Sequence, residues 1–107
     1  MNEPPLWQYD LHRDGGTSTV ALAGEIDLQN ADEVQNLLLE EMQRGDTSAV
    51  EVDLRQVSFL DSTAVGCLIS GYHAAKNTGC GLAVVNPSRP AHRILSLTGV
   101  LAVLTGT

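Results

Sequence analysis

The stretch VDLRQVSFLDSTAVG, residues 52–66, decides the fold, because the hydrophobic period changes inside it. Ala49 to Leu54 alternates and predicts a short strand, and further apolar positions follow as far as Leu60. From Ser62 onward, apolar residues recur at helical spacing, and Gly79 is expected to end that helix. The pattern therefore predicts a strand, a loop of one short turn, and a helix that begins at Asp61-Ser62.

Two strands are predicted upstream of this stretch. Leu6 to His12 alternates as a half-buried strand does, and Thr17 to Ile26 is rich in residues that favour extended structure. Between them, Asp14-Gly15-Gly16 predicts a hairpin turn. Residues 1–5 contain two prolines and predict a disordered lead-in.

A first helix is expected between the second and third strands. Asn30 is a candidate N-cap, and Glu33 follows three residues later as in a capping box. Apolar residues recur after it at helical spacing, and Gly45 is expected to end the helix.

The last third of the chain predicts a strand, a helix and a strand. Gly81 to Val85 is apolar and predicts a buried strand. Ser88 is expected to cap a third helix with Pro90 in its first turn, and Gly99 to end it. Val100 to Leu104 is predicted as the last strand. The order β-β-α-β-α-β-α-β indicates an α/β fold with a mixed, mainly parallel sheet of four to five strands covered by helices.

The charge and composition exclude several classes of partner. The net charge is −7, and the six basic residues are scattered along the sequence. Nucleic-acid backbones and anionic membrane surfaces both require clustered Lys and Arg. We therefore expect neither nucleic acid nor membrane as a partner, although the acidic balance is also explained by solubility alone.

We expect no signal peptide, no membrane span and no metal site in this chain. Residues 1–5 resemble no signal peptide, and no apolar run approaches a membrane span. Cys67 and Cys80 have no zinc spacing and are expected to be reduced and at least partly buried, which is typical of the cytosol. No cofactor or metal is predicted.

Catalysis is not the preferred interpretation. Ser62 lacks the Gly-x-Ser-x-Gly elbow, and His12, His73 and His92 fall in three separate elements. No glycine-rich phosphate loop precedes a helix. Because a Ser-His-Asp triad is defined by geometry, a small hydrolase or nucleotide-processing enzyme stays an alternative.

Two polar segments are candidates for function. Asp61, Ser62 and Thr63 crowd one helix N-terminus, where free N–H groups and the helix dipole favour an anion such as a phosphate on Ser62. The stretch Gly24-Glu25-Ile26-Asp27 places carboxylates at the end of the second strand. Ordinary capping and turn chemistry is the alternative explanation for both segments.

Taken together and in this order, these segments resemble the STAS family, and more narrowly the bacterial anti-sigma factor antagonists. Residues 24–27 resemble that family's Gly-Glu-Leu-Asp segment, and residues 59–66 resemble its Asp-Ser-Ser/Thr-Gly-Leu-Gly signature. Residues 97–101 resemble its closing segment. The likeness spans about residues 6–104, and it implies that residues 1–107 form a single domain of the STAS fold.

The resemblance implies a cytoplasmic switch protein that is not an enzyme. Such proteins bind an anti-sigma factor that is also a serine kinase of the GHKL ATPase type, and thereby free a sigma factor. Phosphorylation then ends the binding, and a PP2C-type phosphatase reverses it. Carried over, Ser62 is the phosphorylated residue and Thr63 a minor candidate. The expected partner-binding residues are Asp27, Asp61, Ser62, Thr63, Ala64 and Gly66.

One departure from the family pattern concerns the choice of partner. Ala64-Val65-Gly66 stands where the family usually has Gly-Leu-Gly, and the methyl group of Ala64 is expected close to the docking surface. A rival hypothesis keeps the same fold but makes the chain a constitutive scaffold subunit of a transporter or stress-signalling complex, in which phosphorylation is secondary or absent.

Overall fold

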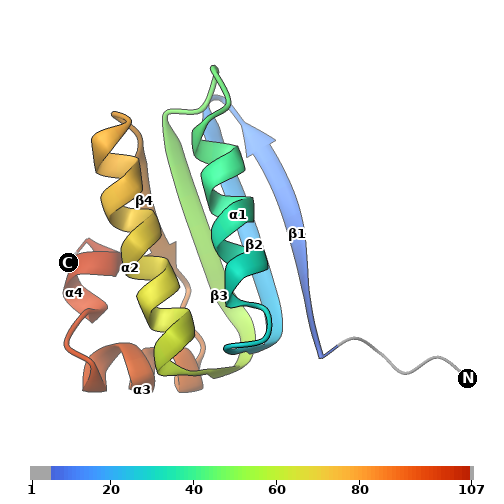
Figure 1. The fold of residues 1–107 in the computed structure, drawn as a ribbon, viewed down its shortest axis with the longest axis vertical. Helices are drawn as coiled ribbons and strands as arrows, with labels where there is room; N and C mark the ends of the chain where they lie inside the picture. Colours follow the sequence, from blue (N-terminus) through green and yellow to red (C-terminus); the bar gives the residue numbers. More distant parts are fainter. Residues whose placement is uncertain (1–5, 107) are drawn as a thin grey trace, which may run out of the picture.

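The computed structural model describes residues 6–106, and the expected lead-in at residues 1–5 lies outside this range. Within it the chain forms one mixed sheet and four helices (Figure 1). In chain order the elements are β1 (Trp7–Asp14), β2 (Thr17–Ile26), α1 (Ala31–Met42), β3 (Ala49–Leu60), α2 (Ser62–Asn77), β4 (Gly81–Val85), α3 (Arg89–Leu97) and α4 (Leu101–Thr105).

The sheet has the strand order β1-β2-β3-β4, so neighbours in space are neighbours in sequence. β1 and β2 form an antiparallel hairpin closed by Gly15 and Gly16, both at positive φ, as a tight two-residue turn requires. β2, β3 and β4 are parallel, and the crossovers between them contain α1 and α2. The predicted fold class is confirmed.

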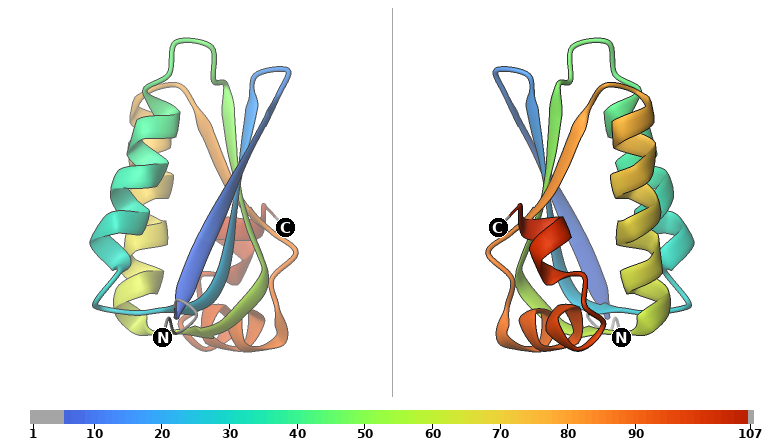
Figure 2. Two further views of the ribbon diagram at one scale, coloured as in Figure 1. Left: turned by 90° about the vertical axis from the view of Figure 1, so that its right-hand side faces the viewer. Right: turned by 90° about the vertical axis from the view of Figure 1, so that its left-hand side faces the viewer.

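The helices lie on opposite sides of the sheet. α1 and α2 run side by side over one face (Figure 1), while α3 and α4 lie on the other side from α1 (Figure 2). The core between the sheet and α1 and α2 is built from aliphatic side chains, as the shortage of aromatics requires. Its largest fully buried members include Leu22, Leu38, Leu54, Leu68 and Val52.

Strand β3 is longer than predicted. The sequence pattern indicated a strand from Ala49 to Leu54 and then a loop, but β3 continues to Leu60. The register against β2 shifts between Ala21 and Ala23 and again between Gly24 and Glu25. Such bulges break the alternation of buried and exposed side chains, so the pattern ceases to look like a strand although the strand continues.

The predicted last strand is wrong, because Val100 to Leu104 does not join the sheet. Residues Leu101–Thr105 form the short helix α4, which contacts β4, α3 and α2. Leu104 is fully buried and Leu101 partly buried, whereas Val103 is exposed, which is a helical spacing. Five apolar residues do not distinguish a strand from a helix by periodicity alone.

Two predicted details of α1 are also wrong. Asn30 occupies the N-cap position as predicted, but its side chain makes no capping hydrogen bond to α1, so the capping box with Glu33 does not form. The helix ends at Met42, and Gly45 has no positive φ. By contrast, Gly79 and Gly99 follow the ends of α2 and α3 in the left-handed conformation, as predicted.

Candidate functional site

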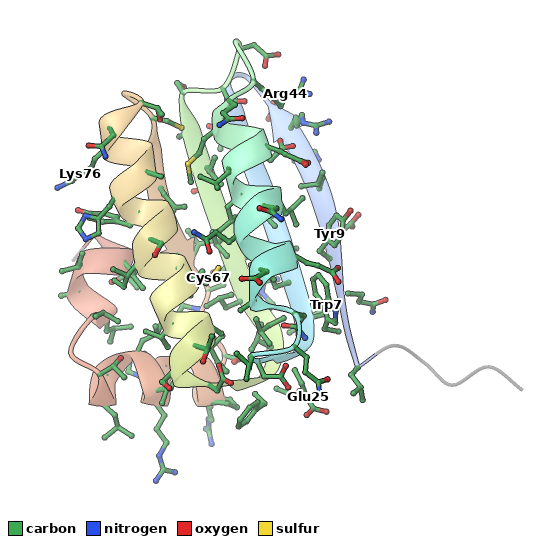
Figure 3. All side chains as sticks on the ribbon, in the orientation of Figure 1. Trp7, Tyr9, Glu25, Arg44, Cys67 and Lys76 are labelled. Carbon is green, nitrogen blue, oxygen red and sulfur yellow. The ribbon has the colours of Figure 1, made fainter. Side chains whose placement is uncertain are left out.

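The two candidate segments meet at the carboxyl end of the parallel strands. β2 ends at Ile26 and β3 at Leu60, and these two residues are paired across the strands. The N–H of Asp61 donates to the carbonyl oxygen of Ile26 at 3.3 Å. The loop that contains Asp27 therefore lies beside the start of α2, at the edge where ligands bind in open α/β sheets. Figure 3 shows Glu25 at this end of the molecule, where α1 begins.

Asp61 joins the two segments. Its Oδ1 accepts a hydrogen bond from the N–H of Ala64 at 2.8 Å, which caps α2. Its Oδ2 accepts another from the N–H of Leu28 at 3.1 Å, in the loop between β2 and α1. Asp61 therefore caps α2, as the alternative explanation of this segment held, and the same carboxylate also holds the neighbouring loop.

The Asp27 loop is held by a second polar side chain. Asn30 is buried, and its Oδ1 accepts from the N–H of Asp27 at 3.0 Å while its Nδ2 donates to the carbonyl oxygen of Glu25 at 3.0 Å. Asp27 in turn accepts from the N–H of Gln29 at 2.9 Å. Asn30 was predicted only as a cap, because its role depends on loop geometry that the sequence does not show.

Ser62 is the first residue of α2 and is exposed, as is Thr63. Among the described residues, none forms a hydrogen bond with either hydroxyl group. The N–H groups of both residues belong to the first helical turn and have no intrahelical acceptor. The Ser62 hydroxyl is thus open to a second protein and lies beside backbone dipoles that favour an added anion.

Ala64 is only 1% exposed, so its methyl group packs in the core and does not lie on the surface. This corrects its assignment as a partner-contacting residue. The cause is helical geometry, since Ala64, Val65 and Leu68 face the sheet. Gly66, in contrast, is exposed, and among the described residues no atom beyond its chain neighbours and the surrounding backbone of α2 lies within 4 Å of the position that a Cβ would take.

The two segments that build the site contain acidic but no basic residues. Lys and Arg are absent from residues 14–43 and from residues 56–75. Acidic residues occur at the strand end, in the loop and in the first turn of α1, namely Glu25, Asp27, Asp32, Glu33 and Asp61. These two segments therefore present negative charge to a partner, and the exposed basic residues Arg89 and Arg93 belong to α3, which packs against β3.

Neither a metal-ligand group nor a membrane-spanning helix occurs among residues 6–106. Within residues 6–106, no group of three or more His, Cys, Asp or Glu side chains could hold a metal ion. No helix in the same range is long and apolar enough to cross a bilayer. Cys67 and Cys80 are free thiols and buried, as predicted.

The fold and its site define a domain of a known family. The family model described as "Mlab, STAS domain" matches residues 9–105, and the chain therefore belongs to the STAS domain family.

Several proteins that this chain resembles are named as antagonists of anti-sigma factors. The chain is 27% identical over 97 residues to the anti-sigma F factor antagonist of Paenibacillus polymyxa, covering 91% of this chain and 83% of the relative. It is similar to the crystal structure of an anti-sigma factor antagonist from Mycobacterium paratuberculosis, with a TM-score of 0.76 and 26% identity over 97% and 87% of the two chains.

The fold is shared with a further solved antagonist. SpoIIAA in its unphosphorylated form gives a TM-score of 0.76 at 18% identity, covering 88% of this chain and 83% of that one. Its phosphorylated form, from Bacillus, gives 0.72 at the same identity, covering 92% and 88%.

Proposed function

We propose that this protein is an anti-sigma factor antagonist that works as a single domain in the cytoplasm. It binds an anti-sigma factor that is also a GHKL-type serine kinase, and so releases a sigma factor. Phosphorylation of Ser62 ends this binding, and a PP2C-type phosphatase restores it. The protein needs no cofactor and catalyses no reaction itself, because Ser62 is the substrate of another protein's chemistry.

One observation supports this proposal above the others, namely the exposed hydroxyl group of Ser62 at the start of α2, which has no hydrogen-bond partner within residues 6–106. The preceding Asp61 is engaged with backbone N–H groups on both of its oxygens. It therefore fixes the helix start and leaves the Ser62 hydroxyl free. The relative from Paenibacillus polymyxa, which matches most of the chain, is named for the same role.

The chemistry of the switch is a phosphoryl transfer. The Ser62 oxygen forms a bond to the γ-phosphorus of ATP, the bond from that phosphorus to the β,γ-bridging oxygen breaks, and ADP leaves with the electron pair. The hydroxyl proton passes to a base of the kinase. The modified Ser62 then carries about −1.5 to −2 charges at neutral pH, next to Asp61 and facing the phosphates of ADP.

The size of the required effect is modest. A switch that lowers affinity about tenfold needs about 1.4 kcal/mol. Repulsion between the phosphoserine, the Asp61 carboxylate and the nucleotide phosphates acts across a partly dehydrated interface, where charges interact more strongly than in water. That repulsion is sufficient for release.

The test compares Ser62 variants as affinity baits. Wild type, Ser62→Ala and Ser62→Asp are immobilised and exposed to lysate of the source cells with added ADP, and retained proteins are identified by mass spectrometry. We expect Ser62→Ala to retain a GHKL-type kinase and Ser62→Asp to lose it. Ser70→Asp is the matched control, because Ser70 is exposed two turns along the same helix, and it should retain the kinase.

The recovered kinase then allows a direct test of the modified residue. Incubation with ATP should add one phosphate to wild type, and peptide mapping should place it on Ser62. A Ser62→Ala protein that accepts phosphate on Thr63 would identify the minor site. Failure to phosphorylate either residue would contradict the switch.

The alternative is a constitutive STAS scaffold subunit of a transporter or stress-signalling complex. The family model's description names a STAS protein other than the antagonists, which is why this alternative is kept. Retention of one and the same non-kinase assembly by wild type, Ser62→Ala and Ser62→Asp would favour the scaffold over the switch.

A further inference from the structure

We propose that Leu28 and Phe59 are apolar anchors of the docking surface around Ser62, and that the partner presents an apolar contact ringed by lysine and arginine side chains. This inference rests on the proposed function, since it names the chemistry by which the anti-sigma factor is recognised. The surface formed by Leu28, Phe59 and the acidic residues around them is called the anchor surface below.

Leu28 is 71% exposed although it is a leucine in a rigidly held loop. Its own N–H is bound to Asp61, and the residues on either side are fixed by Asp27 and Asn30. The loop is therefore ordered by polar contacts, and the leucine side chain contributes little to the core. An exposed apolar side chain on a backbone that is already held can bind a partner without the cost of ordering the loop.

Phe59 is 47% exposed at the end of β3, two residues before Asp61. It is paired across the strands with Glu25, which is also exposed, while the next pair, Ile26 and Leu60, is buried. Alternation along the strand thus places Phe59 and Glu25 on the face opposite to that of Ile26 and Leu60. The N–H of Leu28 is bound to Asp61, and Phe59 precedes Asp61 by two residues, so both apolar side chains come from segments that adjoin Ser62.

The acidic residues of the anchor surface indicate which kind of partner fits it. Glu25 and Asp27 lie beside the two apolar side chains, and Asp32 and Glu33 follow in the first turn of α1. No Lys or Arg occurs in either segment that forms the surface. An interface core of apolar side chains within a charged rim is the usual anatomy of protein recognition, and the partner's rim must be basic to match.

The acidic rim also limits where the repulsion that releases the partner can arise. A basic partner would attract a phosphate on Ser62, so repulsion must come from another source at the point of contact. The phosphates of ADP occupy that point immediately after transfer. Attraction at the rim and repulsion at Ser62 then act in different places, which lets the same partner bind the unmodified protein and release the modified one.

The experiment is a calorimetric titration of the variants with the purified anti-sigma factor kinase and ADP. Truncating a central apolar anchor should weaken binding about tenfold or more, both for Leu28→Ala and for Phe59→Thr, which keeps a strand-forming residue. The control is Leu97→Ala, because Leu97 is 74% exposed and is the last residue of α3, the helix that lies across the sheet from α1 (Figure 2). It should bind within about twofold of wild type.

The contribution of the acidic residues to binding is tested with two substitutions on α1. Glu33→Lys should weaken binding about fivefold or more, and less so as NaCl rises from about 0.05 to about 0.5 M, because salt screens exposed charges. Glu40→Lys is the matched control, being exposed on α1 two turns further from the site. Thermal unfolding of every variant verifies that it is folded.

Each outcome decides between the two proposals. If Ser62→Asp loses binding while the Leu28, Phe59 and Glu33 variants bind like wild type, the anchor surface is overturned and the switch stands. If the anchor variants lose binding while Ser62→Asp retains it, the anchor surface stands and the switch fails. Absence of any anti-sigma factor that binds wild type or Ser62→Ala overturns both.

Discussion

The backbone N–H of Leu28 donates a hydrogen bond to Oδ2 of Asp61 at 3.1 Å, across 33 positions of sequence. The other oxygen of the same carboxylate caps α2. A single side chain therefore sets the start of the helix that presents Ser62 and the position of the loop that presents Leu28. The geometry of the proposed docking surface depends on this residue together with Asn30, which holds the same loop.

Two substitutions of Asp61 test how much its carboxylate contributes to the free energy of unfolding. Asp61→Ala removes the helix cap and leaves the N–H of Leu28 without its acceptor, so we expect a loss of about 1–3 kcal/mol in the free energy of unfolding. Asp61→Asn retains a capping oxygen and should lose less than half of that. Urea denaturation of both variants provides the measurement, and equal losses would contradict the capping role.

Position 24 requires glycine because of its backbone conformation. Its φ is +88°, and a Cβ there would collide with the carbonyl oxygen of Leu6, which accepts a hydrogen bond from the N–H of Glu25. Gly24→Ala should therefore cost about 2 kcal/mol or more in the free energy of unfolding. Gly45→Ala is the control, because its Cβ would meet open space and its φ is not positive. Denaturation by urea should show little change for the control.

At Gly66 we expect an alanine substitution to have the opposite effect on stability. It lies in the interior of α2, exposed, with nothing near the position of a Cβ. Gly66→Ala should raise the free energy of unfolding by about 0.5–1 kcal/mol, because alanine is the better helix former. If the partner packs closely on this face of α2, the same variant should bind the kinase more weakly. A more stable variant with unchanged affinity would remove Gly66 from the interface.

The ion pair between Arg13 and Glu41 predicts a dependence of stability on pH. Two hydrogen bonds of 2.9 and 2.8 Å join the guanidinium group on β1 to the carboxylate on α1, which is buried. The hydrogen bonds from Arg13 lower the pKa of Glu41 below its ordinary value of 4.5. This contribution is therefore present above that value and lost as the pH falls through the lower, folded pKa.

The corresponding experiment compares urea midpoints between neutral and acidic pH. Wild type should lose stability below about pH 4.5 more steeply than Glu41→Gln, which has no charge to lose at this position. The difference between the two curves isolates Glu41 from the other carboxylates. Parallel curves would show that the ion pair has no such role.

Burial makes Cys67 unreactive. Its thiol lies between α1 and α2 (Figure 3), where Sγ donates to the carbonyl oxygen of Ala31 at 3.3 Å. Desolvation, with a smaller effect of Asp32, raises the pKa of Cys67 to about 11. At pH 8 on the order of one molecule in a thousand has the reactive thiolate. Alkylation by iodoacetamide should proceed only on unfolding, and fast labelling of folded protein would contradict this packing.

Much of the fold follows from the sequence alone. Alternating and helical periods, and the glycines that require positive φ, predicted three of the four helices and all four strands of the sheet. The order of Gly24-Glu25-Ile26-Asp27 and Asp61-Ser62-Thr63 identified the family. These features are local, since each depends on residues within a few positions of one another. Local backbone preferences can be predicted from the sequence without knowing which other segment packs against them.

The tertiary structure decided what the local pattern left undetermined. The apolar residues Val100 to Leu104 fit a strand or a helix equally well, and the segment forms α4 where it packs against β4, α3 and α2. The bulges in β3 arise from its register with β2, which no single segment contains. The bond between Leu28 and Asp61, the burial of Ala64 and the exposure of Phe59 likewise depend on how distant segments meet. Side-chain periodicity specifies an element, but contacts between elements determine which side chains are left for a partner.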